Sequence, residues 1–278
     1  MSARRRFHPK SLSSTRIARV ALLCLAAVAC VMALACGGPT RPSPIVEQPP
    51  STPTPIAPPA PPSPPPTLGI TRILAFGDSM TAGTTSPALI AQSLTAGLPQ
   101  SYPFKLQDLL AARYTGQSIT VLNAGKAGEH VVDAGALQRF NDALSEAKPD
   151  LVLLLEGAND LNDTQDMVNA AITLIVGTLE EMVKEAGRRR IPIMVATLPP
   201  QRLPKGTGAP FVARFNDAVK VMAAKKGGIL VDVNAQLPES LIGQDGLHPT
   251  EAGYQRLAEI FLGAIKSSYE SNAAIIAR

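Results

Sequence analysis

The fold is decided by a short stretch, residues 71–83, which reads TRILAFGDSMTAG. Its first half is an apolar run typical of a buried strand, and the run stops at Gly77. A carboxylate and a hydroxyl follow at once, Asp78 and Ser79. A serine in such a turn commonly caps the next helix or bonds its own backbone. The alternative is a nucleophile, and that interpretation requires partner residues farther along the chain.

The pattern of this first run repeats along the chain. Apolar, β-branched runs occur at 71–76, 118–122, 150–155, 191–197 and 229–233. Stretches with a helical period lie near 102–113, 133–146, 166–187, 210–226 and 250–267. Continuous apolar strands that alternate with helices indicate a parallel sheet covered on both faces. We therefore predict one three-layer α/β domain with a five-stranded parallel sheet, spanning residues 68–272.

The N-terminal segment is predicted to be a targeting signal. A basic start leads into an uninterrupted apolar run, residues 20–36, which ends in small residues before Cys36. This ending resembles a bacterial lipobox, in which the cysteine is lipidated, with Cys30 as a weaker candidate. Ordinary cleavage after Ala35 and an uncleaved membrane span are the alternatives. We expect residues 1–36 to be the signal and the protein to be an envelope lipoprotein anchored to the membrane through Cys36.

A proline-rich stretch follows the signal. Residues 37–66 hold 14 of the 26 prolines of the chain. Such a composition favours extended polyproline II and cannot form a core, so we expect a linker over residues 37–67. The alternative is a ligand for a proline-binding module.

Charge and cysteine content narrow the chemistry of the domain. The net charge is +4, but residues 1–36 hold six Arg or Lys and no acid, and residues 37–66 are neutral, which leaves −2 for residues 67–278. A mildly acidic domain is not expected to bind nucleic acid. All three cysteines lie in the signal, so the domain can have neither an internal disulfide nor a cysteine nucleophile.

Polar residues gather where the predicted strands end. Ligands of open α/β sheets bind beyond the carboxyl ends of the strands. Ser79 follows the first strand, Gly128 lies in the loop after the second, Asn159 follows the third, and Asp245 with His248 follows the fifth. A nucleophile, a base, an orienting carboxylate and oxyanion donors are the parts that acyl transfer needs. The spacing of Asp245 and His248 allows one turn to carry both groups.

The sequence resembles the GDSL or SGNH hydrolases over residues 70–268. FGDSMTAG, NAGKAG, GAND and DGLHPT match the family's blocks in order and spacing. The resemblance implies a flavodoxin-like fold and an esterase that needs no metal or cofactor. It also implies Ser79 as the nucleophile, His248 as the base and Asp245 as its orienting group. The oxyanion hole would consist of Ser79, Gly128 and Asn159.

The expected substrates are small-molecule, glycan or lipid esters, for an esterase, a lysophospholipase-like enzyme or a carbohydrate O-deacetylase. An acyltransferase with the same triad and a non-catalytic envelope binding module are the rival interpretations. Residues 84–100 are expected to shape the substrate pocket. His130 could line that pocket or face solvent, whereas Asp78 and Asp160 are expected to organise their loops.

Overall fold

The computed structural model describes residues 65–84, 100–164 and 167–271. The predicted signal, Cys36, most of the proline-rich linker and most of the 84–100 segment lie outside the described residues. The predictions made for them therefore remain predictions.

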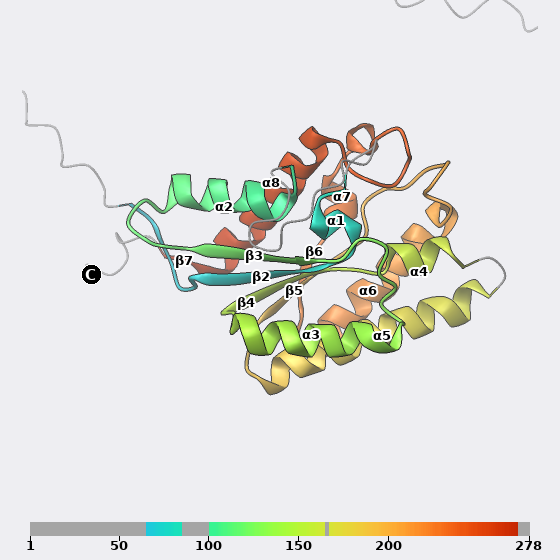
Figure 1. Ribbon diagram of the computed structural model, residues 1–278, viewed down its shortest axis with the longest axis horizontal. Coiled ribbons are helices and arrows are strands. Elements are labelled where there is room, and N and C mark those ends of the chain that lie inside the picture. Colours follow the sequence, from blue (N-terminus) through green and yellow to red (C-terminus); the bar gives the residue numbers. More distant parts are fainter. Residues whose placement is uncertain (1–64, 85–99, 165–166, 272–278) are drawn as a thin grey trace, which may run out of the picture. The chain divides into compact units, whose positions relative to one another are not determined.

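A five-stranded parallel sheet forms the centre of the described domain (Figure 1). The strand order is β3-β2-β4-β5-β6, and every neighbouring pair is parallel. The strands are β2 (Arg72–Gly77), β3 (Thr120–Gly125), β4 (Leu151–Leu155), β5 (Ile193–Ala196) and β6 (Ile229–Val231). The predicted α/β fold with a five-stranded parallel sheet is confirmed.

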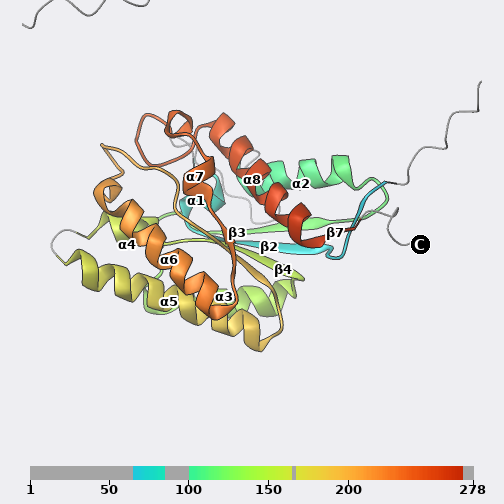
Figure 2. The same cartoon turned by 180° about the vertical axis from the view of Figure 1, so that it is seen from behind.

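Helices cover both faces of the sheet. The α-helices are α1 (Ser79–Ala82), α2 (Tyr102–Arg113), α3 (Ala134–Ala147), α4 (Ala158–Asn162), α5 (Val168–Arg188), α6 (Val212–Lys226), α7 (Val233–Gln236) and α8 (Glu251–Tyr269). Short 3-10 turns occupy Ala209–Phe211 and Glu239–Leu241. Helices α2 and α8 pack together on one face, whereas α3, α5 and α6 cover the other (Figures 1 and 2). The three-layer arrangement follows from this.

Local sequence signals explain the main elements. All five residues of β4 are buried, as expected for a central strand with helices on both faces. The hydroxyl of Ser101 accepts from the Phe104 amide and caps α2. Thr250 caps α8 in the same way, accepting from the Gly253 amide at 3.0 Å. Aromatic rings join the two helices, since Tyr102 stacks on Phe261 with centroids 4.9 Å apart.

A small second sheet was not predicted. Strands β1 (Thr67–Leu68) and β7 (Glu270–Ser271) pair antiparallel near the two ends of the described domain. Arg113, the last residue of α2, donates two hydrogen bonds, of 2.7 and 2.8 Å, to the carboxylate of Glu270 in β7. These bonds connect the small sheet to α2. Two-residue strands leave no periodicity in a sequence, so the pattern of apolar residues could not show them.

The three strands β2, β3 and β4 end at the same level. Gly77, the last residue of β2, pairs with Gly125 at the end of β3 and with Leu155 at the end of β4. The chain packs closely here, because a Cβ on Gly125 would stand 2.1 Å from the backbone nitrogen of Ala82 in α1. Only glycine therefore allows α1 to sit against the end of β3.

In the part of the chain that the structure describes, no helix combines the length and the apolar character that crossing a membrane requires.

We predict that Gly125→Ala destabilises the domain. The added methyl group would collide with backbone atoms of α1, which cannot move as a flexible side chain can, so the cost should be about 1–3 kcal/mol or more. Gly116→Ala is the matched control, because nothing lies within 4 Å of the corresponding position. Urea unfolding followed by circular dichroism measures both. Equal stability of the two variants would contradict the close approach described above.

Candidate active site

The Ser79 hydroxyl lies at the start of α1, directly after strand β2. Asp78 precedes it and caps α1, since its Oδ1 accepts from the Met80 amide at 2.9 Å. The helix ends at Gly83, which has a left-handed φ of 95°. Ser79 is therefore not the cap of this helix, and the side chain that caps it is the neighbouring carboxylate. This leaves the Ser79 hydroxyl free to bond elsewhere.

The structure brings Ser79, His248 and Asp245 into one hydrogen-bonded chain. His248 Nε2 lies 2.9 Å from Ser79 Oγ, although 169 residues separate the two positions. On the other side of the ring, His248 Nδ1 lies 2.6 Å from Asp245 Oδ2. All three residues are buried or nearly so. A hydroxyl, an imidazole and a carboxylate linked in this order form the arrangement in which the imidazole can take the hydroxyl proton.

Asp245 is held as a carboxylate by its own loop. Its Oδ1 accepts from the backbone amides of Leu247 and His248, at 3.1 and 3.0 Å. Burial raises the pKa of Asp245, but the hydrogen bonds from the His248 ring and from these amides outweigh it, and the pKa is lowered overall. The Nζ of Lys205, an exposed side chain, lies 3.6 Å from Oδ2. The charge of Asp245 is therefore available to orient the imidazole and to stabilise its protonated form.

The loop after β5 supports the loop that carries Asp245 and His248. The Arg202 amide donates to the Gly246 carbonyl and the Lys205 amide to the Asp245 carbonyl, both at 2.8 Å. The Arg202 guanidinium donates to the carbonyls of Ile242 and Gly243. Gly246 has a φ of 81°, and a Cβ there would stand 1.9 Å from the Arg202 carbonyl oxygen. The position of the imidazole thus depends on a second loop.

Gly128 and Asn159 follow the two strands that lie on either side of β2. Gly128 follows β3 and Asn159 follows β4, the two strands that flank β2. The Asn159 amide donates to the Glu129 carbonyl at 2.8 Å, which leaves its second N–H free. Gly128 is exposed with a φ of 77°, and nothing lies within 4 Å of a Cβ placed on it. The left-handed backbone, rather than crowding by the protein, is therefore what calls for glycine here.

Helix α4 and the 128–132 loop are tied together by further hydrogen bonds. The Asp160 carboxylate accepts from the Val131 and Val132 amides at 2.9 and 3.1 Å, so it organises this loop, as the sequence suggested. His130 is half-buried, and its Nε2 lies 2.7 Å from Asp163 Oδ2. Burial lowers the pKa of His130, but Asp163 and the nearby Asp160 and Asp133 raise it overall.

Two carboxyl groups, those of Asp78 and Glu156, are more deeply buried than the sequence indicated. Asp78 was expected only to organise its loop, yet burial raises its pKa to about 7, with Asp160 and Glu129 adding to the effect. Glu156 ends the β4 run, and both of its carboxylate oxygens are buried without a hydrogen-bond partner. Burial, and then the charge of Asp78, raise its pKa well above the usual range. A glutamate directly after five apolar residues was the available signal.

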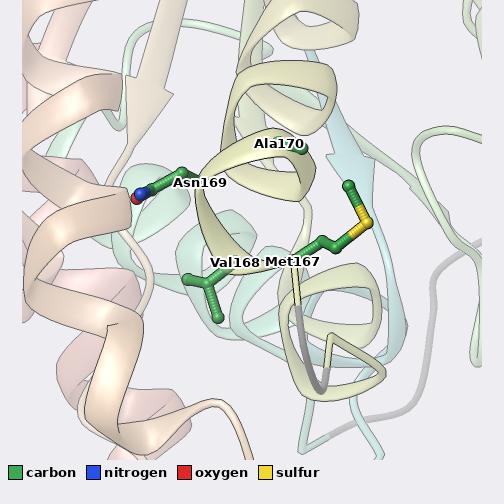
Figure 3. Close-up of a pocket in the computed structure, with 4 residues that line it drawn as sticks. All are labelled: Met167, Val168, Asn169 and Ala170. Carbon is green, nitrogen blue, oxygen red and sulfur yellow. The ribbon is translucent and has the colours of Figure 1, made fainter.

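A shallow pocket of about 360 Å³ lies at the start of α5. Figure 3 shows the four residues that line it, Met167–Ala170. Only Asn169 among them carries a polar side chain, and its Oδ1 accepts from Arg214 at 2.7 Å. The lining therefore offers no group for acid–base or nucleophilic chemistry.

Several known proteins are similar to this chain in sequence or in fold. A family model described as the GDSL-like Lipase/Acylhydrolase family matches residues 75–256. An arylesterase from Vibrio mimicus is 26% identical over 192 residues, which cover 68% of this chain and 84% of the relative. Among solved structures, a lipase/acylhydrolase from Enterococcus faecalis has a TM-score of 0.57 at 24% identity, over 72% of this chain and 97% of its own. A catalytic mutant of an acetylxylan esterase from Geobacillus stearothermophilus has a TM-score of 0.58 at 25% identity, with coverages of 71% and 94%.

We predict that Asp78→Asn changes stability in a pH-dependent way. The folded protein keeps the Asp78 proton up to about pH 7, whereas the unfolded chain releases it near pH 3.8. The wild-type protein therefore loses stability at this position as pH rises from 4 to 8, on the order of a few kcal/mol. Asn is neutral at every pH and keeps an acceptor for the Met80 amide. The stability of the variant relative to wild type should therefore increase as the pH rises from 4 to 8. Urea midpoints at pH 4.5, 6 and 7.5 measure the difference.

Asp150→Asn is the control for this experiment. Hydrogen bonds from the Thr71 backbone and other groups at the start of β2 lower the pKa of Asp150 below 3.8. The Asp150 charge therefore makes its full contribution to stability at all three pH values. The difference in urea midpoint between Asp150→Asn and wild type should stay constant from pH 4.5 to 7.5. If the difference in urea midpoint between Asp78→Asn and wild type were also independent of pH, Asp78 would not be held in its protonated form.

Proposed function

The chain belongs to the GDSL-like lipase/acylhydrolase family and is an ester hydrolase, and we propose that it acts through a covalent acyl-enzyme on Ser79. The observation that carries this proposal is the chain of hydrogen bonds from Ser79 through His248 to Asp245. It provides a nucleophile, a base within reach of the nucleophile's proton, and a carboxylate that orients the base.

In the first half of the reaction, Ser79 Oγ attacks the ester carbonyl carbon while its proton passes to His248 Nε2. Asp245 stabilises the imidazolium that forms, and the carbonyl oxygen becomes an oxyanion. The Ser79 and Gly128 amides and the free N–H of Asn159 are the donors we propose for this charge. The tetrahedral intermediate collapses as the C–O bond to the alcohol breaks, and the alcohol leaves with the proton from His248. The acyl group remains on Ser79.

In the second half, a water molecule attacks the acyl carbonyl and gives its proton to the same imidazole. The second tetrahedral intermediate collapses, Ser79 regains the proton from His248, and the carboxylic acid leaves. An acyltransferase would place another alcohol where this water attacks. A neutral imidazole is required in both halves, because it accepts a proton in each of them.

The substrates we propose are short-chain esters of aryl alcohols or of glycans. The relatives named above are an arylesterase and an acetylxylan esterase, and this supports a small acyl group. The Ser79 hydroxyl is buried, with 5% of the residue exposed, whereas Gly128 in the loop after β3 is exposed. A recessed nucleophile beside an exposed loop suits an ester with a compact acyl group and an alcohol part that extends to the surface. A lysophospholipase-like activity is the other outcome of the substrate test.

We predict that Ser79→Ala abolishes hydrolysis without unfolding the domain. Removal of the nucleophile should lower kcat by about 10⁴-fold or more. Ser145→Ala is the matched control, because the exposed Ser145 hydroxyl on α3 bonds only groups outside the proposed site: it donates to the Asn141 carbonyl and accepts from Arg189. Nitrophenyl acetate, butyrate and decanoate, acetylated xylan and a lysophospholipid serve as substrates, with and without an added alcohol acceptor. We expect the highest kcat/KM on acetyl esters.

Several outcomes of this experiment would contradict the proposal. A Ser79→Ala variant that kept a tenth of the wild-type turnover would exclude the acyl-enzyme on this serine. A product that forms only with the added alcohol would indicate the acyltransferase instead. Failure of a fluorophosphonate to label Ser79 of the wild-type protein stoichiometrically would favour the binding module. Preference for the lysophospholipid would overturn the substrate class alone.

We also propose that the enzyme is a lipoprotein of the bacterial envelope, anchored through Cys36. The support is the sequence alone: a basic start, an apolar run that ends at Cys36, and a proline-rich stretch after it. We predict that Cys36→Ser releases the domain from the membrane fraction or blocks processing, because stable anchoring needs acyl chains on this cysteine. The intact mass of the mature N-terminus measures the modification. An unmodified Cys36 would refute the anchor and leave the esterase proposal unaffected.

A further inference from the structure

Arg139 on α3 connects three segments that surround the proposed active site. Its Nη2 donates to the Gly77 carbonyl at 3.2 Å, at the end of the nucleophile strand. Its Nη1 donates to the Ala124 carbonyl at 2.6 Å, near the end of β3. Its Nε lies 2.9 and 3.0 Å from the two carboxylate oxygens of Glu129, and Nη2 also bonds this carboxylate. One guanidinium therefore bonds to β2, to β3 and to the loop after β3.

The surroundings fix the guanidinium in this place. Its carbon lies 3.8 Å from the centre of the Phe76 ring, a cation–π distance. Phe76 is itself held edge-on against Phe140, with ring centroids 5.0 Å apart. The Glu129 side chain is only 2% exposed and the Arg139 side chain 25%. Lys126 Nζ also lies 3.3 Å from Glu129 Oε1, but the lysine side chain is 62% exposed, so Arg139 is the less exposed of the two cations that pair with this carboxylate. Removing it should be costly, because the Glu129 charge would stay buried with one exposed partner.

Glu129 links this ion pair to both of the proposed oxyanion donors outside α1. Its peptide bond joins it to Gly128, whose amide is one donor, and its carbonyl accepts from the side chain of Asn159, the other donor. Nothing in the described structure packs against the α-carbon side of Gly128 where a Cβ would stand. The position of the Gly128 amide thus depends on its neighbours in the loop. Among them, Glu129 has a buried side chain that is held by an ion pair with Arg139.

We propose that Arg139 is a positioning residue for the oxyanion hole. By bonding the Gly77 carbonyl and the Glu129 carboxylate at once, it fixes the oxyanion loop relative to the strand that carries Ser79. It does not touch the substrate and acts through Gly128 and Asn159. The inference rests on the proposed function of these two groups. A donor that is displaced by a fraction of an ångström stabilises the transition state less, while binding of the ground state changes little.

The test compares Arg139→Met, Arg139→Lys and Asn159→Ala, with kcat and KM measured on nitrophenyl acetate. Asn159→Ala removes a donor, so kcat should fall about 10²–10³-fold. Arg139→Met should lower kcat by roughly 10–10²-fold with little change in KM. Lys keeps the charge beside Glu129 but lacks the planar fork needed to bond two carbonyls as well, so Arg139→Lys should be intermediate. This variant also serves if the Met variant fails to fold.

A double-mutant cycle separates positioning from general loss of structure. If Arg139 acts through the oxyanion donors, the effects of Arg139→Met and Asn159→Ala should be less than multiplicative in the double variant. Arg113→Met is the matched control, since it also removes a two-point arginine–glutamate pair, with Glu270, next to the small second sheet. It should lower thermal stability and leave kcat at the wild-type value.

Three results would overturn the inference. These are a wild-type kcat in Arg139→Lys or Arg139→Met, an effect confined to KM, or fully multiplicative effects in the cycle. Ser79→Ala is measured in parallel: if it is inactive and labelling of wild-type Ser79 is stoichiometric, any of these results refutes the role of Arg139 while the proposed function stands. If Ser79→Ala stays active, the proposed function itself fails.

Discussion

The common end point of three neighbouring strands is the constraint on which the rest of the structure depends. Gly77 faces Gly125 on one side and Leu155 on the other, so β2, β3 and β4 stop in line. Each strand then releases a loop at the same edge of the sheet. Because of this register, the segments that carry Ser79, Gly128 and Asn159 all start from the same edge of the sheet, although 80 residues separate the first from the last. A shift of one strand by a single residue would move its loop by about 3.3 Å and turn its side chains to the opposite face.

The imidazole depends on a different kind of support. His248 belongs to a loop without a strand partner in the sheet, and its place is set by the loop after β5 and by the two amides that Asp245 accepts. Asp78, next to Ser79 in the chain, and Glu156, directly after β4, are buried with raised pKa values. The surroundings of these two groups favour the protonated form, whereas hydrogen-bond donors keep Asp245 charged. Two kinds of carboxyl group lie in one region, and their surroundings separate their roles.

Much of this arrangement could be predicted from the sequence, because its signals are local. The unbroken apolar run of β4 and the helical periods of α2, α5 and α8 indicated the sheet and its layers. The four sequence blocks placed Ser79, Gly128, Asn159 and the Asp245–His248 turn at strand ends, and the structure does bring Ser79, Asp245 and His248 together. Arg139 was not foreseen, because its three partners lie 10, 15 and 62 residues away and no spacing encodes them. The short elements α1, α4, β1 and β7 also escaped, since two to five residues contain too little pattern to be recognised.

The pairing of β1 with β7 determines how the domain is oriented when it is attached through either of its ends. Thr67 faces Ser271, so the chain enters and leaves at one place, next to the amino ends of the sheet strands (Figure 1). Ser79, which follows the last residue of β2, is at the opposite end of the strands, together with the His248 ring that it contacts. A support fastened to either end of the domain therefore leaves the catalytic face pointing away from it. An enzyme immobilised on a bead, or fused at either end to a carrier, would keep its reaction centre open to large or insoluble substrates.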